Sequence, residues 1–282
     1  MVRIITDSAS DFEPNEIAKL SLYSVPLSVS FGDATYQENV NLSKKMFYHL
    51  LEREPHMPRT SQPSPQAFLS VLQKVQEAGD QAVVITMSSA LSGTYQGAIL
   101  AKNTLGFEEC FVIDSLTATA GERLLVEVAL SLRSEGKTAA EIAEALESLR
   151  TRVSLYACMD TLKYLHKGGR LSSATYLVGS MMNIKPILHV SPDGRAEIPA
   201  KVRGVRKGTH YLIDKLRSEK MDPTYPLYIV YTGSQENGVM LAAELQKQGF
   251  SVPPQRIVPV GAVVGAHIGP NAFGIVYVSH LP

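Results

Sequence analysis

The chain has 282 residues, of which 45% are apolar and 19% charged, a composition typical of a folded globular protein. Lys plus Arg and Asp plus Glu both number 27, and this neutral balance disfavours nucleic acid as a partner, because phosphate binding needs clustered positive charge. Neither a signal-peptide pattern nor a run of about 18 apolar residues occurs, so we expect no stable membrane insertion and a cytoplasmic location.

Strand and helix patterns alternate in the first half of the chain. Continuous β-branched runs, which suit strands buried on both faces of a parallel sheet, occur at residues 2–6, 25–31, 81–87 and 110–113. The stretches between them predict helices at 65–78, 94–105 and 119–135. Thr138 and Glu141 fit a capping box at the start of one more helix. We therefore predict an N-terminal α/β domain over residues 1–152, with a parallel sheet flanked by helices.

The second half has a different order of elements. A strand at 155–159 is followed by a short helix that Gly168 and Gly169 end, and by a small apolar segment at 172–182. Strands at 186–190 and 196–202 flank a strong turn signal and predict a hairpin. Later elements are a helix at 207–220, a strand at 227–232, a helix at 235–248, and apolar stretches at 257–264 and 274–278. We predict a C-terminal α/β domain over residues 153–282 with a mixed or antiparallel sheet.

Several kinds of catalytic and cofactor chemistry lack their sequence patterns. The seven histidines are scattered and Cys110 and Cys158 stand far apart, so we expect neither a metal site nor a disulfide. Residues 136–138 imitate the end of a P-loop, but Ser131 occupies the place of its first glycine. The chain also lacks a dinucleotide fingerprint and a nucleophile elbow. We expect no cofactor and no catalytic residue.

Three segments rich in small residues stand out as candidate ligand-binding loops, at 59–65, 88–94 and 265–270. We expect them at strand ends, where ligands of parallel α/β sheets gather. A helix that begins near Thr94 would direct its free amides into this region and, with the hydroxyls, form a neutral site for a carboxylate. Taken singly, such segments are more typical of caps and turns, and a lone His267 is more typical of a structural hydrogen bond.

Together the three segments resemble the signature blocks of the DegV family, which includes the fatty-acid-binding subunit of bacterial fatty acid kinase. The blocks read Thr-Ser-Gln-Pro-Ser at 60–64, Leu-Ser-Gly-Thr-Tyr at 91–95 and Gly-Ala-His-Ile-Gly-Pro at 265–270. Further matching blocks follow in order at 5–8, 112–115, 164–171, 184–188 and 201–204, so the resemblance covers nearly the whole chain. Ala90 departs from it, because many members carry glycine there.

The resemblance implies two α/β domains with an acyl chain buried between or beneath them. In family terms, Thr60 and Ser92 bind the carboxylate of a long-chain fatty acid, and His267 lies nearby in the same head-group network. The neighbouring residues Ser61, Gly93 and Thr94 are expected in the same ligand-binding site.

The resemblance also implies a division of labour with a second protein. Arg170 and Arg203 match positions tied to docking on an ATP-dependent fatty acid kinase. That partner, and not this chain, would bind ATP and phosphorylate the carboxylate, so we expect a carrier and not an enzyme.

Two other functions stay open at the level of the sequence. A serine hydrolase of lipid esters would use Ser92 as nucleophile, His267 as base and either Asp7 or Asp114 as the orienting acid. A lipid-responsive regulator of a protein partner would use the same lipid site without any reaction.

Overall fold

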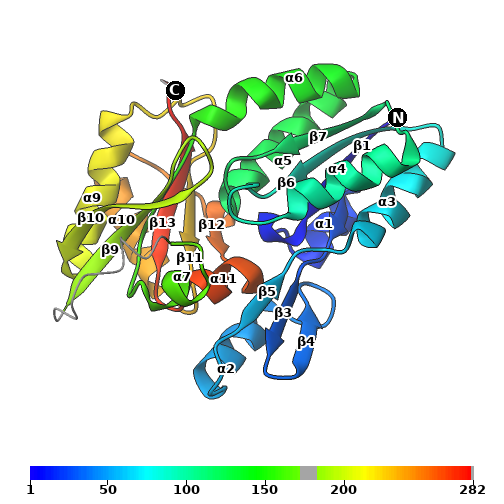
Figure 1. Ribbon diagram of the computed structural model, residues 1–282. Coiled ribbons are helices and arrows are strands. Elements are labelled where there is room, and N and C mark those ends of the chain that lie inside the picture. The colour runs from blue at the N-terminus through cyan, green and yellow to red at the C-terminus, as the bar shows by residue number, and fades with distance from the viewer. Residues whose placement is uncertain (172–182, 281–282) are drawn as a thin grey trace.

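The computed structural model describes residues 1–171 and 183–280 and contains an N-terminal parallel sheet, a small antiparallel sheet and a C-terminal mixed sheet (Figure 1). The predicted segment at 172–182 lies outside the described residues. In the described part of the chain, no helix combines the length and the apolar composition needed to cross a membrane.

The N-terminal sheet is parallel, as the buried runs predict. Its strands, in spatial order, are β2 (Tyr23–Val25), β1 (Val2–Asp7), β6 (Gln81–Thr86) and β7 (Cys110–Asp114). Helices α3 (Pro65–Glu77) and α4 (Thr94–Leu105) cover one face, and α5 (Ala120–Ser134) and α6 (Ala139–Leu149) cover the other. Alternate residues of β6 confirm burial on both faces: Val84 packs with α3, whereas Val83 and Ile85 pack with α5.

The predicted strand at 25–31 is wrong, because the chain leaves the parallel sheet at Pro26. Proline has no amide to donate to a neighbouring strand, and the next amide, of Leu27, donates instead to the Ser8 hydroxyl at 3.0 Å. The chain then enters the small antiparallel sheet, whose strands in spatial order are β4 (Ala34–Gln37), β3 (Ser28–Phe31) and β5 (Arg59–Ser61).

The C-terminal sheet is mixed and carries the predicted hairpin. Its strands, in spatial order, are β10 (Ala196–Arg203), β9 (Ile184–Val190), β8 (Val153–Cys158), β13 (Phe273–Val278), β11 (Tyr228–Tyr231) and β12 (Ile257–Pro259). Neighbours are antiparallel except β11 and β12. Helices α9 (Gly204–Ser218) and α10 (Glu236–Lys247) cover one face. The other face shares a core with α5 and α6 of the N-terminal half.

Several short elements complete the described chain. They are the helices α1 (Pro14–Leu20), α2 (Lys44–Arg53), α7 (Lys163–Lys167) and α11 (Ala262–Ile268), and the 3-10 turns η1 (Ser8–Ser10), η2 (Arg150–Arg152) and η3 (Pro254–Arg256). The capping box of α6 is present, with Thr138 and Glu141 each accepting the other's backbone amide. The boundary at residue 152 stays a prediction; η2 joins α6 to β8 there.

Candidate functional site

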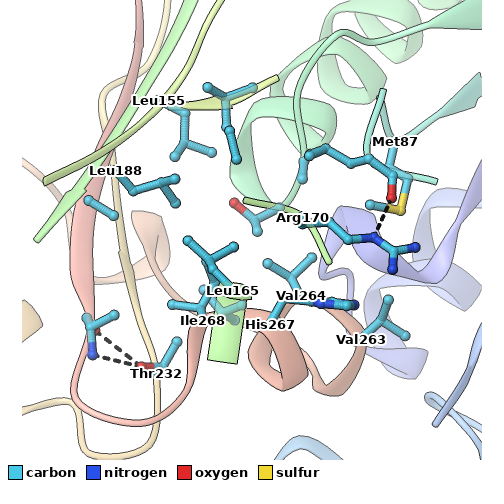
Figure 2. A pocket seen from close by; sticks show the side chains of 18 of the residues that line it. Met87, Leu155, Leu165, Arg170, Leu188, Thr232, Val263, Val264, His267 and Ile268 are labelled. Atoms are coloured by element: carbon cyan, nitrogen blue, oxygen red, sulfur yellow. Dashed lines mark hydrogen bonds between the residues drawn. The ribbon is translucent and has the colours of Figure 1, made fainter. Parts of the chain in front are cut away.

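A cavity of about 340 Å³ lies between the N-terminal and C-terminal halves. This volume falls in the range of about 300–1,000 Å³ that is usual for small-molecule sites. Most of its lining is apolar, and the polar lining residues include Thr60, Ser61, Ser92, Arg170 and His267. Figure 2 shows Leu155 and Leu188 on the side of the C-terminal sheet, across from Arg170, His267 and Val263.

One side of the cavity, which we call the sheet wall, is built by the C-terminal sheet. Its residues are Leu155 and Ala157 of β8, Leu188 and Val190 of β9, Ala196 of β10, Val230 of β11 and Phe273 of β13. The period of two along β8 explains the chemistry of this wall, because Leu155 and Ala157 face the cavity while Tyr156 and Cys158 pack beneath α9. The same sheet thus serves as both cavity lining and core.

The opposite side, which we call the loop wall, is built by loops and by α11. It contains residues of β5 and the loop after it, the loop between β6 and α4, and the segment after α7. Its lining residues include Thr60, Ser61, Gln62, Leu91, Ser92, Arg170, Val263, Val264, His267 and Ile268. All three candidate segments from the sequence therefore meet at one cavity, although they lie as much as 207 residues apart.

Hydroxyl groups and an imidazole form the polar part of the loop wall. Thr60 Oγ1 and His267 Nε2 share a hydrogen bond of 2.8 Å, and Ser92 Oγ and Thr94 Oγ1 share another of 2.8 Å. Helix α4 begins at Thr94, as predicted, so its unpaired amides lie next to these hydroxyls. Such a group can hold a carboxylate by hydrogen bonds.

His267 is a neutral histidine in this setting. Burial, and to a lesser extent the charge of the nearby Arg170 guanidinium, lower its pKa from 6.5 to about 4. Its Nδ1 atom is buried without a hydrogen-bond partner among the described residues and lies against Gly168, where a Cβ atom would clash with the ring. The neutral ring therefore presents Nε2 to Thr60 and can act as donor or acceptor there.

Arg170 joins two parts of the loop wall. Its Nε donates to the Leu91 carbonyl at 3.0 Å, the bond drawn from Arg170 in Figure 2. Its Nη1 donates to the Gly168 carbonyl at 2.7 Å. The residue is exposed. It thus lines the cavity from a position that solvent reaches.

Most of the predicted site residues lie at the cavity, and one lies away from it. Thr60, Ser61, Ser92, Arg170 and His267 line the cavity together. Gly93 and Thr94 follow Ser92 directly, and the end of the Gln62 side chain lies against Gly93.

Arg203 lies elsewhere. It is an exposed residue at the end of β10, just before α9, and it does not line the cavity. The structure does not test its predicted part in partner docking.

The third candidate segment is not at the end of a strand, which corrects that expectation. Residues 265–268 form the last part of α11, and Gly269 ends the helix with φ +77°. Gly265 allows α11 to lie against Phe47 and Tyr48 of α2, where a Cβ atom would be 2.7 Å from the tyrosine oxygen.

Sequence reasoning missed the sheet wall and Gln62. Strand alternation in residues 153–158 was a signal for the wall, but it does not say which face meets a core and which meets a cavity. Gln62 lies inside the candidate segment 59–65, but nothing in the sequence distinguishes it there. Its contact with Gly93 is seen only in the structure.

The hydrolase alternative has no support from the contacts. Ser92 bonds to Thr94 and not to His267, whose Nε2 bonds to Thr60. Asp7 accepts the amides of Ala9 and Met87, and Asp114 accepts those of Ser89 and Leu116. These side chains therefore do not form the hydrogen-bonded chain from nucleophile to base to acid that such an enzyme uses. Within residues 1–171 and 183–280, no group of three His, Cys, Asp or Glu side chains is placed to hold a metal ion.

Fold and cavity together define an α/β protein with two main sheets and an internal, mostly apolar cavity that ends in a cluster of hydroxyls. The chain belongs to the DegV family: the family model described as "Uncharacterised protein, DegV family" matches residues 1–280.

Curated relatives agree with this assignment over the whole length. A DegV domain-containing protein of Caldanaerobacter subterraneus is 32% identical over 277 residues, which cover 98% of each chain. A DegV domain-containing protein of Lactococcus lactis is 34% identical over 285 residues, covering 98% of this chain and 97% of the relative.

Solved structures share the fold. A structure on fatty acid binding by a DegV family protein from Thermus thermophilus has a TM-score of 0.88 at 29% identity, covering 99% of both chains. A Thermotoga maritima protein whose structure is described as revealing fatty acid binding function has a TM-score of 0.85 at 29% identity, also over 99% of both chains. DegV of Bacillus subtilis, described as a fatty acid binding protein, has a TM-score of 0.84 at 26% identity over the same coverage.

Proposed function

We propose that this protein is a fatty-acid carrier that buries a long acyl chain and presents its carboxylate to a separate kinase. The observation that carries the proposal is the cavity of about 340 Å³, whose apolar lining reaches Thr60, Ser92 and His267. A mostly apolar cavity with a cluster of hydroxyls and an imidazole on its loop wall matches a molecule with a long apolar chain and one polar end. The fatty-acid binding described for the related structures supports the same ligand class.

The sheet wall accounts for affinity. Burying about 14 methylenes at roughly 0.8 kcal/mol each gives a gross gain on the order of 10 kcal/mol. Ordering the flexible chain and losing translational freedom offset part of this gain. What remains is enough for the ligand to stay bound during purification.

The loop wall accounts for orientation. A buried carboxylate without partners would cost several kcal/mol, so the head group lies where donors are available. The Thr60 and Ser92 hydroxyls donate to it, and the neutral His267 completes the network from its place beside Thr60. Ser61, Gly93 and Thr94 shape the same end of the cavity.

Two exposed arginines form the docking surface that we propose for the kinase. Arg170 lines the cavity and is open to solvent, so an ATP-dependent kinase that contacts it would lie next to the carboxylate. Arg203 would extend the docking surface over the start of α9. In this arrangement the chain binds and presents its ligand, and the kinase phosphorylates it.

The first test is mass spectrometry of an organic extract from the purified, denatured protein. We expect a long-chain fatty acid at close to one molecule per chain. An empty extract, followed by failure to take up added fatty acid, would reject the carrier and leave the lipid-responsive regulator without its ligand as well.

A double variant then tests the head-group site. Thr60→Ala with Ser92→Ala is expected to weaken fatty-acid binding by about tenfold to a hundredfold, because two hydrogen bonds to a charged acceptor are lost. The matched control is Ser30→Ala with Thr35→Ala, which removes a hydroxyl pair of the same length, 2.8 Å, from the exposed part of the same small sheet. Equal affinity in the folded site variant and the control would count against this placement of the carboxylate.

A further inference from the structure

Helix α11 belongs to one half of the molecule by sequence and to the other by packing. It follows β12 and precedes β13, both strands of the C-terminal sheet. Its residues Ala262, Val263 and Ala266 nevertheless share a hydrophobic cluster with η1, β3, α2 and other N-terminal segments. Figure 1 shows α11 beside β5 and the small antiparallel sheet.

The start of α11 is held by two buried carboxylates from the N-terminal half. Asp11 Oδ1 accepts the Gly261 amide at 2.8 Å, and Glu38 Oε1 accepts the Val263 amide at 3.1 Å. Both side chains are about 1% exposed, so neither contact is shared with solvent. A Cβ atom at position 261 would clash with both carboxylates, and glycine there lets them approach. The two acids therefore satisfy amides that the helix itself leaves unpaired.

The two carboxylates are themselves held in place. Glu38 Oε2 accepts the Ser8 hydroxyl at 2.8 Å. The buried Lys44 donates to the Asp11 carbonyl at 2.8 Å and forms an ion pair with Glu13 at 3.0 Å. Just before the helix, the Tyr48 hydroxyl donates to the Val260 carbonyl at 3.0 Å. The anchor of α11 is thus built from η1, the loop after β4, and α2.

The far end of the same helix reaches the cavity. His267 lies four residues after Val263, about 6 Å along the axis at roughly 1.5 Å per residue. Over so short a distance a helix transmits a shift at its start with little loss. His267, which bonds to Thr60, thus lies four residues after Val263 and six after Gly261, whose amides Glu38 and Asp11 accept.

We infer that Asp11 and Glu38 are positioning residues for the polar end of the cavity. They hold the start of α11 and, through that helix, place the His267 ring against Thr60 in the buried position that the head group requires. The part of this inference that concerns the head group rests on the proposed function. The placement of His267 itself is a property of the protein without its ligand.

The test compares Glu38→Ala with wild type by NMR titration of the histidine rings, on full-length protein passed over a hydrophobic resin to remove bound lipid. In wild type the pKa of His267 is expected near 4, because the ring is buried. In Glu38→Ala we expect this pKa to rise toward 6.5, because a loosened α11 lets water reach the ring. Glu38→Gln keeps an oxygen that accepts the Val263 amide and is expected to restore the wild-type value.

Fatty-acid affinity is measured on the same proteins. Loss of a helix-capping acceptor predicts about tenfold weaker binding for Glu38→Ala, with recovery in Glu38→Gln. Asp33→Ala is the control, since it removes an exposed acid from the turn between β3 and β4 and should leave both the His267 pKa and the affinity unchanged. If Glu38→Ala does not fold, Ser8→Ala replaces it, with a smaller rise in the His267 pKa expected.

A folded Glu38→Ala or Ser8→Ala protein in which the pKa of His267 stays near 4 would overturn the inference. Failure of wild type to bind any fatty acid would instead reject the proposed function. The histidine titration would still decide whether Glu38 places His267, so the two failures are distinguishable.

Discussion

The two walls of the cavity differ in how they are built, and the difference separates affinity from orientation. The sheet wall is a regular strand surface on which apolar side chains recur every second residue, as at Leu155 and Ala157. The loop wall gathers side chains from segments far apart in the chain, such as Thr60 and His267. A strand surface offers contact area for a chain of methylenes, whereas loops bring individual hydrogen-bonding groups to one point.

The largest effect is expected from placing a polar group in the sheet wall. Leu188→Gln buries an amide that has no partner in this apolar surface, which costs about 1–3 kcal/mol, and we expect fatty-acid binding to weaken by up to about a hundredfold. Leu188→Met keeps the volume and the apolar character and should bind nearly as wild type. The measurement is the dissociation constant of a long-chain fatty acid for each variant. Similar values for Leu188→Gln and Leu188→Met would contradict the assignment of affinity to the sheet wall.

A second prediction concerns the pH dependence of stability that arises from two buried acids, Asp7 and Asp11. Burial raises the pKa of both Asp7 and Asp11 from 3.8 to about 7. A raised carboxyl pKa favours the protonated folded state, so the stability from these groups is full below about pH 3.8 and is lost as pH rises to about 7. The free energy of unfolding is therefore expected to fall as pH rises from 5.5 to 7, by an amount on the order of 1 kcal/mol per pH unit.

Chemical denaturation at the two pH values measures this loss. Asp11→Asn keeps an oxygen for the Gly261 amide and cannot ionise, so its stability should fall less steeply with pH than that of wild type. Identical slopes for the two proteins would show that Asp11 does not titrate in this range.

The smallest effect is expected from changing the shape of the sheet wall while keeping its chemistry. Ala157→Leu fills part of the cavity without adding a polar group, so the longest acyl chains should be lost first. Each methylene that no longer fits costs about 0.8 kcal/mol, or roughly fourfold in affinity. Acyl chains extracted from the variant should be shorter than those from wild type. An unchanged distribution would place the acyl chain away from β8.

Much of the fold could be predicted from local pattern. Residues 2–6, 81–87 and 110–113 read as strands buried on both faces, and they form the parallel sheet. The hairpin of β9 and β10 and the capping box at Thr138 were equally local, since each depends on residues a few positions apart. The break at Pro26 was missed because an apolar run can continue across two strands that belong to different sheets.

The sequence by itself determined which side chains were available for a site: the hydroxyls of 60–64 and 91–95, and His267 in the segment 265–270. Only the tertiary structure decided that these meet across 207 residues, that α11 carries the histidine, and that Asp11 and Glu38 hold that helix. The physical reason is one of range. Backbone preferences and hydrophobic periodicity act over a few residues, whereas a contact such as Asp11 with Gly261, 250 residues apart, exists only after the strands between them have found their order.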